Sequence, residues 1–259
     1  MIRSVDQLNE EIILEKFPER IISLVPSISE LLWDLGLRNE ICGITKFCIH
    51  PAEMFESKTR IGGTKNADHD KIAALKPDLI IGNKEENTKE DIEKLRLSHN
   101  VWMSDINTVK DALGMITQIG LLTGKFKEAE LLTEKIRTQR KSFPSRKKVI
   151  YLIWNHPVYA AGKDTFIDSM IYESGFENCI TSPRYPEITG KEIKALNPDY
   201  LFLSTEPYPF QEKHFYEFEP FISREKIVLV SGEYYSWYGS RMAEAYPYFE
   251  NLRKNLDHR

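Results

Sequence analysis

The stretch Ile72-Ala-Ala-Leu-Lys-Pro-Asp-Leu-Ile-Ile81 decides the fold, because it recurs 121 positions later as Ile193-Lys-Ala-Leu-Asn-Pro-Asp-Tyr-Leu-Phe202. Five aligned positions carry the same residue in the two copies, namely Ile, Ala, Leu, Pro and Asp. A proline disfavours helical geometry in the residue before it, so each copy predicts a short helix that ends before Pro77 or Pro198. The apolar residues that follow the Pro-Asp pair predict a strand that enters a sheet at once.

A second matched pair lies upstream of the repeat. Arg20-Ile-Ile-Ser-Leu-Val25 and Lys148-Val-Ile-Tyr-Leu-Ile153 are mostly apolar, which is typical of strands buried on both faces of a parallel sheet. Each is followed by a predicted helix that ends at Gly36 or Gly175, where glycine suits a left-handed residue. This alternation predicts an α/β protein with two Rossmann-like lobes, each built on a parallel sheet.

Two of the predicted helices begin with the pattern of a capping box. The residues are Ser27-Ile-Ser-Glu30 at the first helix and Thr189-Gly-Lys-Glu192 at the second copy of the repeat. In such a box, the hydroxyl and the carboxylate each accept a hydrogen bond from a backbone N–H group at the start of the helix.

Residues 108–142 connect the two halves. Apolar side chains recur there at three- and four-residue spacing, and no proline occurs before Pro144. We therefore expect a single long α-helix, bent near Gly124, which would span roughly 50 Å if straight. The expected domains are residues 1–106 for the N-terminal α/β lobe, 107–144 for the connecting backbone helix and 145–259 for the C-terminal α/β lobe.

Composition and motifs exclude several classes of function. The 259 residues carry a net charge of −4, so no overall basic field favours nucleic acid. Neither a phosphate-binding loop nor a G-x-S-x-G nucleophile motif occurs. The three cysteines form no CxxC pair and imply no disulfide framework. We therefore predict a protein that is not an enzyme and has no catalytic residues and no nucleic-acid partner. We also expect a monomer.

Residues 1–20 contain five acidic residues and no apolar run long enough for a secretory signal. The expected location is therefore the cytoplasm if this chain is the native full-length one.

Aromatic residues form the strongest candidate site. Nine of them lie outside the predicted strand and helix cores, and several follow strand ends, where open α/β sheets bind ligands. They are Trp154, Tyr159, Tyr185, Tyr208, Phe210, Tyr234, Tyr235, Trp237 and Tyr238. With Phe47 in the first lobe they predict a cleft for a flat apolar ligand, in which Glu233, Arg241 and Asn83 orient the ligand.

A metal site is the alternative. Cys48, His50, Asp68, His69 and Asp70 are close in sequence, and His156 follows a predicted strand of the second lobe. These residue types would suit zinc or iron, although their spacing matches no known ligand pattern. Under this alternative, the chain would be a cytoplasmic metal-handling protein or an enzyme on the same fold that uses His50, His69 or His156.

The segments Arg20–Leu32, Gly43-Ile-Thr, Ile72–Ile81 and Ala161-Gly-Lys163 resemble the helical-backbone (class III) periplasmic substrate-binding proteins of ABC importers. The resemblance covers nearly the whole chain and is closest to the vitamin B12 (cobalamin) receptors. It implies a periplasmic location and transport of a corrinoid, a ferric siderophore or haem, bound between the two lobes. No intrinsic cofactor is implied, and the expected partners are this small-molecule ligand and an ABC permease.

The resemblance also carries over individual positions. The cleft aromatics of the cobalamin receptors fall on Phe47, Tyr159 and Tyr185, and two ring-facing positions fall on Thr64 and Asn83. The acidic contact falls on Glu233, while a nearby arginine falls on Trp237. With Trp154 and Arg241 from the residue-based analysis, these are the predicted ligand-binding residues, and no metal ligand is predicted. The two acidic residues that dock on the permease fall on Asp70, which keeps the charge, and Lys191, which reverses it.

Overall fold

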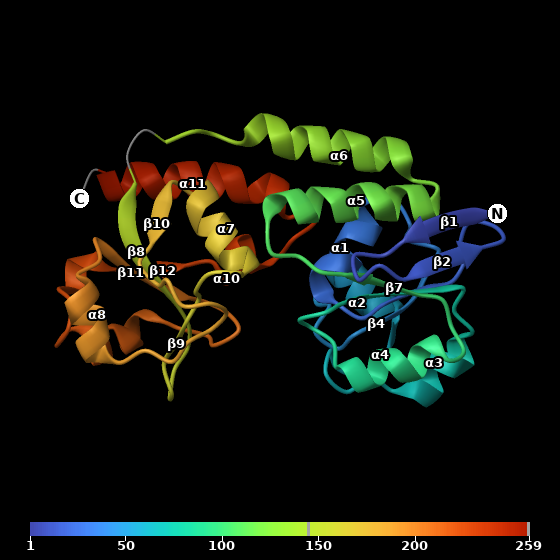
Figure 1. The fold of residues 1–259 in the computed structure, drawn as a ribbon, viewed down its shortest axis with the longest axis horizontal. Coiled ribbons are helices and arrows are strands. Elements are labelled where there is room, and N and C mark those ends of the chain that lie inside the picture. The colour runs from blue at the N-terminus through green and yellow to red at the C-terminus, as the bar shows by residue number, and fades with distance from the viewer. Residues whose placement is uncertain (144–145, 258–259) are drawn as a thin grey trace. The chain divides into compact units, whose positions relative to one another are not determined.

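The computed structural model describes residues 1–143 and 146–257. The chain divides into two compact units (Figure 1). Unit 1 consists of residues 1–106, 110–137 and 238–241, and unit 2 of the described residues among 107–109, 138–237 and 242–259. Both units are α/β and contain a parallel sheet, as the sequence predicts. The domain boundaries drawn from the sequence stay a prediction.

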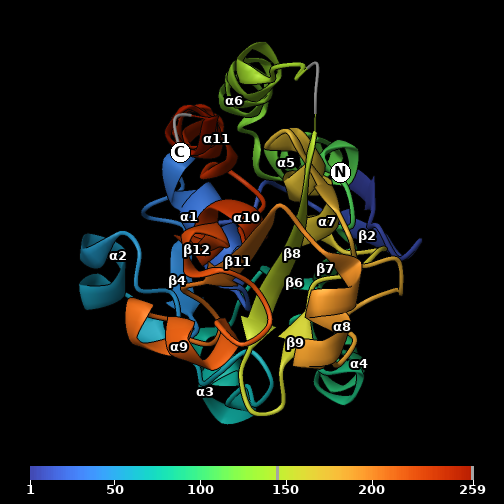
Figure 2. The same cartoon turned by 90° about the vertical axis from the view of Figure 1, so that its left-hand side faces the viewer.

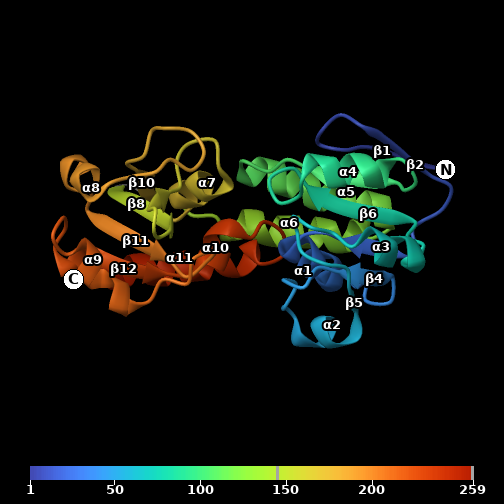
Figure 3. The same cartoon turned by 90° about the horizontal axis from the view of Figure 1, so that it is seen from below.

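Unit 1 contains a five-stranded parallel sheet with the strand order β5-β4-β3-β6-β7. In Figure 3 this order runs from β4 and β5 beside α2 to β6 beside α4. Its elements are β1 (Ile2–Val5), β2 (Glu11–Leu14), β3 (Ile21–Ser23), α1 (Pro26–Asp34), β4 (Ile41–Ile44), α2 (Ala52–Ser57), β5 (Thr59–Arg60), α3 (His69–Leu75), β6 (Leu79–Asn83), α4 (Lys89–Arg96), β7 (Val101–Ser104), α5 (Val109–Thr123) and α6 (Phe126–Gln139).

Unit 2 repeats this arrangement with the parallel order β10-β8-β11-β12, and β9 pairs antiparallel with β8. Figure 2 shows β12, β11 and β8 side by side. The elements are β8 (Lys147–Trp154), β9 (Tyr159–Ala160), α7 (Phe166–Glu173), β10 (Phe176–Asn178), α8 (Gly190–Leu196), β11 (Tyr200–Ser204), η1 (Glu212–His214), α9 (Phe215–Phe218), η2 (Arg224–Lys226), β12 (Ile227–Val230), α10 (Gly232–Ser236) and α11 (Met242–Asp257).

The sequence repeat forms the same structure twice. Its copies are α3 with β6 in unit 1 and α8 with β11 in unit 2. Lys76 and Asn197, the residues before the two prolines, take a left-handed conformation that ends each helix. Every residue of β6 and of β11 is buried, which explains their apolar composition.

One of the two predicted capping boxes is confirmed. Thr189 accepts a hydrogen bond from the Glu192 backbone N–H, and the Glu192 carboxylate accepts one from the Thr189 backbone N–H. The box at Ser27–Glu30 is wrong: α1 begins earlier, at Pro26, after an N-cap at Val25 that makes no side-chain cap bond. Proline at the start of a helix has no N–H group that needs a partner, so the helix starts there without a box.

The prediction of one long helix over residues 108–142 is also wrong. The chain forms two helices, α5 and α6, which lie side by side in Figure 1. Gly124 takes a left-handed φ of +73° between them, a conformation open to glycine at little cost. A Cβ on Gly120 would lie 2.4 Å from the Cβ of Ala129, so the missing side chain lets the two helices pack closely. Helical spacing is the same for one helix and for a packed pair, so it did not distinguish them.

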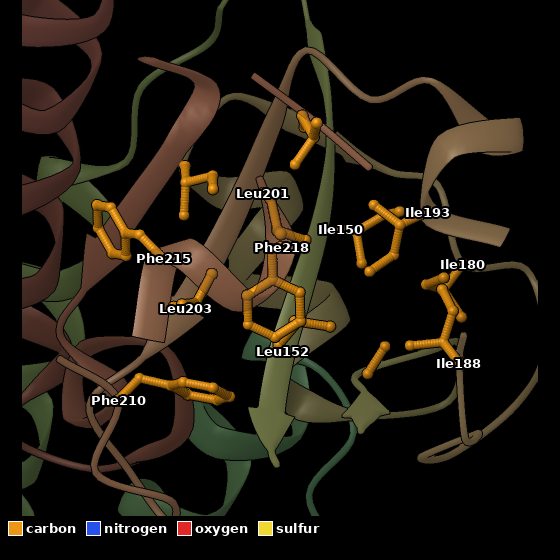
Figure 4. Packing of buried hydrophobic residues seen from close by; sticks show 13 residues of the cluster. Ile150, Leu152, Ile180, Ile188, Ile193, Leu201, Leu203, Phe210, Phe215 and Phe218 are labelled. Atoms are coloured by element: carbon orange, nitrogen blue, oxygen red, sulfur yellow. The ribbon is translucent and has the colours of Figure 1, made fainter. Parts of the chain in front are cut away.

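One apolar cluster of the core of unit 2 includes residues of α8 and α9 and lies against β8 and β11. Ile150 and Leu152 of β8 pack there with Leu201 and Leu203 of β11 and with Phe210 (Figure 4). These strands are therefore held rigidly, and the residues that follow their carboxyl ends start from fixed positions.

Candidate functional site

Three of the predicted ligand-binding residues of unit 1 lie at or after the carboxyl ends of strands of the same parallel sheet. Phe47 comes after β4, Thr64 after β5, and Asn83 ends β6. Carboxyl ends of parallel strands meet at one edge of a sheet, so these positions share that edge. The Phe47 side chain is 50% exposed, and the Lys46 ammonium lies 5.1 Å from the centre of its ring.

Asn83 is used by the fold. It is 2% exposed, and its amide nitrogen donates to the Ser104 hydroxyl at 3.0 Å. Its amide oxygen accepts hydrogen bonds from the backbone N–H groups of Glu85 and Glu86 at 2.8 and 3.2 Å. These contacts shape the turn after β6 and leave the amide no free face for a ligand.

Asn87, which the sequence analysis missed, connects the loops at this edge. Its side-chain nitrogen donates to the carbonyl oxygens of Leu24 at 3.2 Å and Thr64 at 3.0 Å. Its side-chain oxygen accepts from the Asn83 backbone N–H at 2.8 Å. Burial raises the pKa of the neighbouring Glu86 carboxyl, an effect that the positive charge of Lys65 partly offsets.

In unit 2, the structure brings three predicted aromatic residues together. Trp154, Tyr159 and Tyr185 line an open hollow of about 350 Å³ together with Ile153. Trp154 ends β8 and stands opposite Tyr159 of β9 in the antiparallel pair. Tyr159 also bridges to Glu187, which brings the segment containing Tyr185 alongside. The Trp154 side chain is 42% exposed.

Some of the other aromatic residues predicted for this surface are part of the core instead. Phe210 belongs to the apolar cluster of unit 2. Tyr235 packs against Tyr151 and Phe249, with ring centres 5.0 and 4.8 Å apart, and Tyr238 is also buried. The prediction used only the position of these residues outside the strands. That position does not distinguish a core ring from an exposed one, because loops and short helices also cover the core.

Glu233 and Trp237 lie in and directly after α10, which follows the carboxyl end of β12. Both side chains are partly exposed. Arg241 differs, because its guanidinium forms a two-pronged ion pair with Glu30 of α1, at 2.9 and 2.5 Å. The two side chains are 13% and 14% exposed. Arg241 therefore connects parts of unit 1, and the prediction that it orients a ligand does not fit this geometry.

The two predicted docking residues occupy equivalent places in the repeat. Asp70 lies in the first turn of α3 and Lys191 in the first turn of α8, and both are exposed. Glu192, beside Lys191, is held in the capping box. The start of α8 therefore displays two exposed charges, the ammonium of Lys191 and the carboxylate of Glu192, whose pKa is lowered by its hydrogen bonds with Thr189.

Two of the three histidines of the metal hypothesis, His69 and His156, pair with carboxylates. His69 lies 2.8 Å from Asp91, and His156 lies 3.2 Å from Glu217. Burial raises the pKa of Asp91, but hydrogen bonds from His69 and Thr88 outweigh it, so the pKa lies below its usual range. Within residues 1–143 and 146–257, no three His, Cys, Asp or Glu side chains gather closely enough to hold a metal ion.

A larger hollow of about 530 Å³ lies elsewhere in unit 2, and most of the residues that line it carry polar or charged side chains. Its Lys163 ammonium is 3.0 Å from the Asp168 carboxylate, which also accepts a hydrogen bond from Asn178. Because these groups satisfy one another, the aromatic hollow is the stronger candidate site. Among the described residues, no helix is long and apolar enough to span a membrane.

Comparison with known proteins shows a matching family and several proteins similar to this chain. The sequence profile of a family described as periplasmic binding protein matches residues 21–221. An uncharacterized ABC transporter substrate-binding lipoprotein, YvrC of Bacillus subtilis (strain 168), is 27% identical over 213 residues, 76% of this chain and 67% of that protein. A cobalamin-binding protein of Halobacterium salinarum is 26% identical over 213 residues, which cover 76% of this chain and 56% of that protein.

The chain thus spans little more than half the length of the Halobacterium relative. Among solved structures, the periplasmic heme-binding protein RhuT from Roseiflexus sp. RS-1 superposes with a TM-score of 0.79 at 18% identity. The superposition covers 92% of this chain and 97% of that one, and at this identity the likeness concerns the fold.

Proposed function

The chain belongs to the periplasmic binding protein family, whose profile matches residues 21–221, and on that premise we propose that it is the substrate-binding protein of an ABC-type importer. Its ligand is a corrinoid of the cobalamin type or another metal chelate, such as haem or a ferric siderophore. The names of a cobalamin-binding relative and of a heme-binding structure of the same fold support this class of ligand.

The aromatic hollow in unit 2 carries the proposal. Ile153, Trp154, Tyr159 and Tyr185 offer apolar faces at the carboxyl end of β8. Flat rings stack on such faces and gain both from the burial of apolar surface and from ring-to-ring geometry. The macrocycle of a corrinoid or a haem presents a flat apolar body of this kind.

Further proposed contacts are Phe47 and Thr64 in unit 1, and Glu233 and Trp237 in unit 2. Asn83 and Arg241 are left out, because hydrogen bonds and an ion pair within unit 1 occupy their side chains. Binding of this kind needs no catalytic group and no intrinsic cofactor, and the family is one of binding proteins.

Fluorescence titration tests the proposal. Cobinamide, hemin and a ferric hydroxamate siderophore are titrated separately while tryptophan emission and the melting temperature are followed. At least one is expected to quench emission and raise the melting temperature, since a ligand of the native state stabilises it. Trp154→Ala is expected to weaken that ligand on the order of tenfold or more, as loss of an aromatic anchor does.

The matched control is Tyr216→Ala on α9, where the ring is 68% exposed and lies outside the hollow. This variant should bind as the unaltered chain does. The proposal is wrong if none of the three compounds shifts emission or melting temperature, or if Trp154→Ala and Tyr216→Ala bind equally well.

As part of the same proposal, the protein works outside the cytoplasmic membrane as a monomer and delivers its ligand to a permease. The similarity to a substrate-binding lipoprotein of Bacillus subtilis supports this location. Asp70 and Lys191, exposed at the starts of α3 and α8, are the proposed docking residues.

A further inference from the structure

Tyr208 lies beside the aromatic hollow and is held in a defined position. Its ring centre is 5.8 Å from that of Trp154, in edge-to-face geometry, and 4.7 Å from that of the core residue Phe210. Its backbone N–H donates to the carbonyl oxygen of Ile153 at 3.3 Å. Tyr208 thus extends the aromatic surface beyond Trp154, and its ring is anchored on the core.

His214 sets the hydrogen-bonding role of the Tyr208 hydroxyl. The backbone N–H of Gln211 donates to Nδ1 of His214 at 2.9 Å. A backbone N–H can only donate, so Nδ1 is an acceptor and the ring hydrogen of the neutral imidazole lies on Nε2. Nε2 faces the Tyr208 hydroxyl at 3.4 Å. The phenol oxygen therefore accepts from His214, and the phenol hydrogen is left for another acceptor.

A positive charge lies close to another lining residue of the same hollow. The Arg184 guanidinium is 5.4 Å from the centre of the Tyr185 ring, which lines the hollow. A cation on one face of a ring makes the potential beside that ring more favourable to an anion. The surface therefore combines apolar ring faces, a phenolic donor and a nearby cation.

From this arrangement we infer that the ligand of the hollow carries an acidic oxygen group, such as a carboxylate, at the edge of its flat apolar body. Tyr208 donates a hydrogen bond to that oxygen, while Trp154, Tyr159 and Tyr185 hold the apolar body. Tyr208 is thus a specificity-determining residue, and His214 is a positioning residue that acts through it. The inference rests on the proposed function, because it assigns the ligand chemistry of the same site.

Two fluorescent probes of matched shape isolate the acidic group. 8-Anilinonaphthalene-1-sulfonate carries a sulfonate, and N-phenyl-1-naphthylamine has the same aromatic body without it. The Kd of each probe is measured for the full chain and for Tyr208→Phe, which keeps the ring and removes the hydroxyl. A hydrogen bond to a charged oxygen is among the stronger hydrogen bonds. Tyr208→Phe should therefore lower the affinity for the sulfonate probe, relative to that for the neutral probe, about tenfold and leave the Kd of the neutral probe unchanged.

Tyr216→Phe is the matched control. It removes the hydroxyl group from an exposed tyrosine ring on α9 and should change the Kd of neither probe. Trp154→Ala should weaken both probes alike, which reports on the hollow itself. If Trp154→Ala weakens both probes but Tyr208→Phe leaves their ratio unchanged, the inference about Tyr208 is overturned and the hollow stands. If Trp154→Ala has no effect on either probe, the proposed binding surface fails together with the inference.

Discussion

At the scale of the residue, Asn83 illustrates how a polar side chain at the end of a strand is absorbed by the fold. Its amide bonds two backbone N–H groups of the following turn and the Ser104 hydroxyl of the neighbouring strand β7. Buried donors without partners are costly, so the turn after β6 depends on this amide. The loops that carry Phe47 and Thr64 begin at the same edge of the sheet.

We therefore expect Asn83→Ala to destabilise the protein by about 1 to 3 kcal/mol, because it leaves partly buried backbone donors and the buried Ser104 hydroxyl without this partner. Urea unfolding followed by circular dichroism measures this loss. Asn251→Ala, at an exposed position on α11, is the control and should stay close to the unaltered chain. Equal midpoints for the two variants would show that the Asn83 amide is dispensable.

At the scale of the element, the close packing of α5 against α6 depends on the position of a glycine in α5. Gly120 is buried where α6 packs against α5, and an added Cβ there would lie 2.4 Å from Ala129. Gly114, six residues earlier in the same helix, is exposed, and an added Cβ there would lie 3.9 Å from Nε2 of Gln7. The same substitution therefore meets opposite surroundings at the two positions.

Gly120→Ala is expected to destabilise the protein by about 1 to 3 kcal/mol through overpacking. Gly114→Ala is expected to stabilise it by up to about 1 kcal/mol, because alanine favours a helix interior more than glycine does. Thermal unfolding of the two variants side by side measures both effects. A single continuous helix over residues 109–139 would make both substitutions stabilising, and that result would contradict the helix pair.

At the scale of the whole molecule, the proposed docking predicts that delivery of the ligand depends on the charges at the starts of α3 and α8. In proteoliposomes with the permease and ATPase of its importer, Asp70→Lys should reduce ligand-dependent ATP hydrolysis on the order of tenfold, because it places like charges together at docking. Ligand affinity in solution should not change, since Asp70 lies outside the hollow.

Glu56→Lys, an equal change of charge at an exposed position on α2, is the control for Asp70→Lys and should stimulate the ATPase normally. Lys191→Glu tests the second docking position in the same assay and should also weaken stimulation, since a matched permease complements the charge that the chain displays. Normal stimulation by both docking variants would exclude α3 and α8 as the docking elements.

The sequence by itself determined the class of fold, because its evidence is local. The repeat at Ile72 and Ile193 specifies a helix, a proline stop and a buried strand through short-range sterics and apolar runs, and both copies form as predicted. It also brought Trp154, Tyr159 and Tyr185 into consideration, because they belong to a set of aromatic residues outside the predicted strand and helix cores, several of which follow strand ends where open α/β sheets bind ligands.

Only the tertiary structure decided how individual side chains are used. Spacing could not separate one helix from the pair α5–α6, because helical periodicity is identical in both. The sequence predicted Asn83 and Arg241 as ligand contacts. In the structure, their side chains bind partners distant in sequence, Ser104 for Asn83 and Glu30 for Arg241. Phe210 and Tyr235 are in the core while Trp154 is exposed. Burial and pairing depend on contacts between segments far apart in the chain, and no local pattern encodes those contacts.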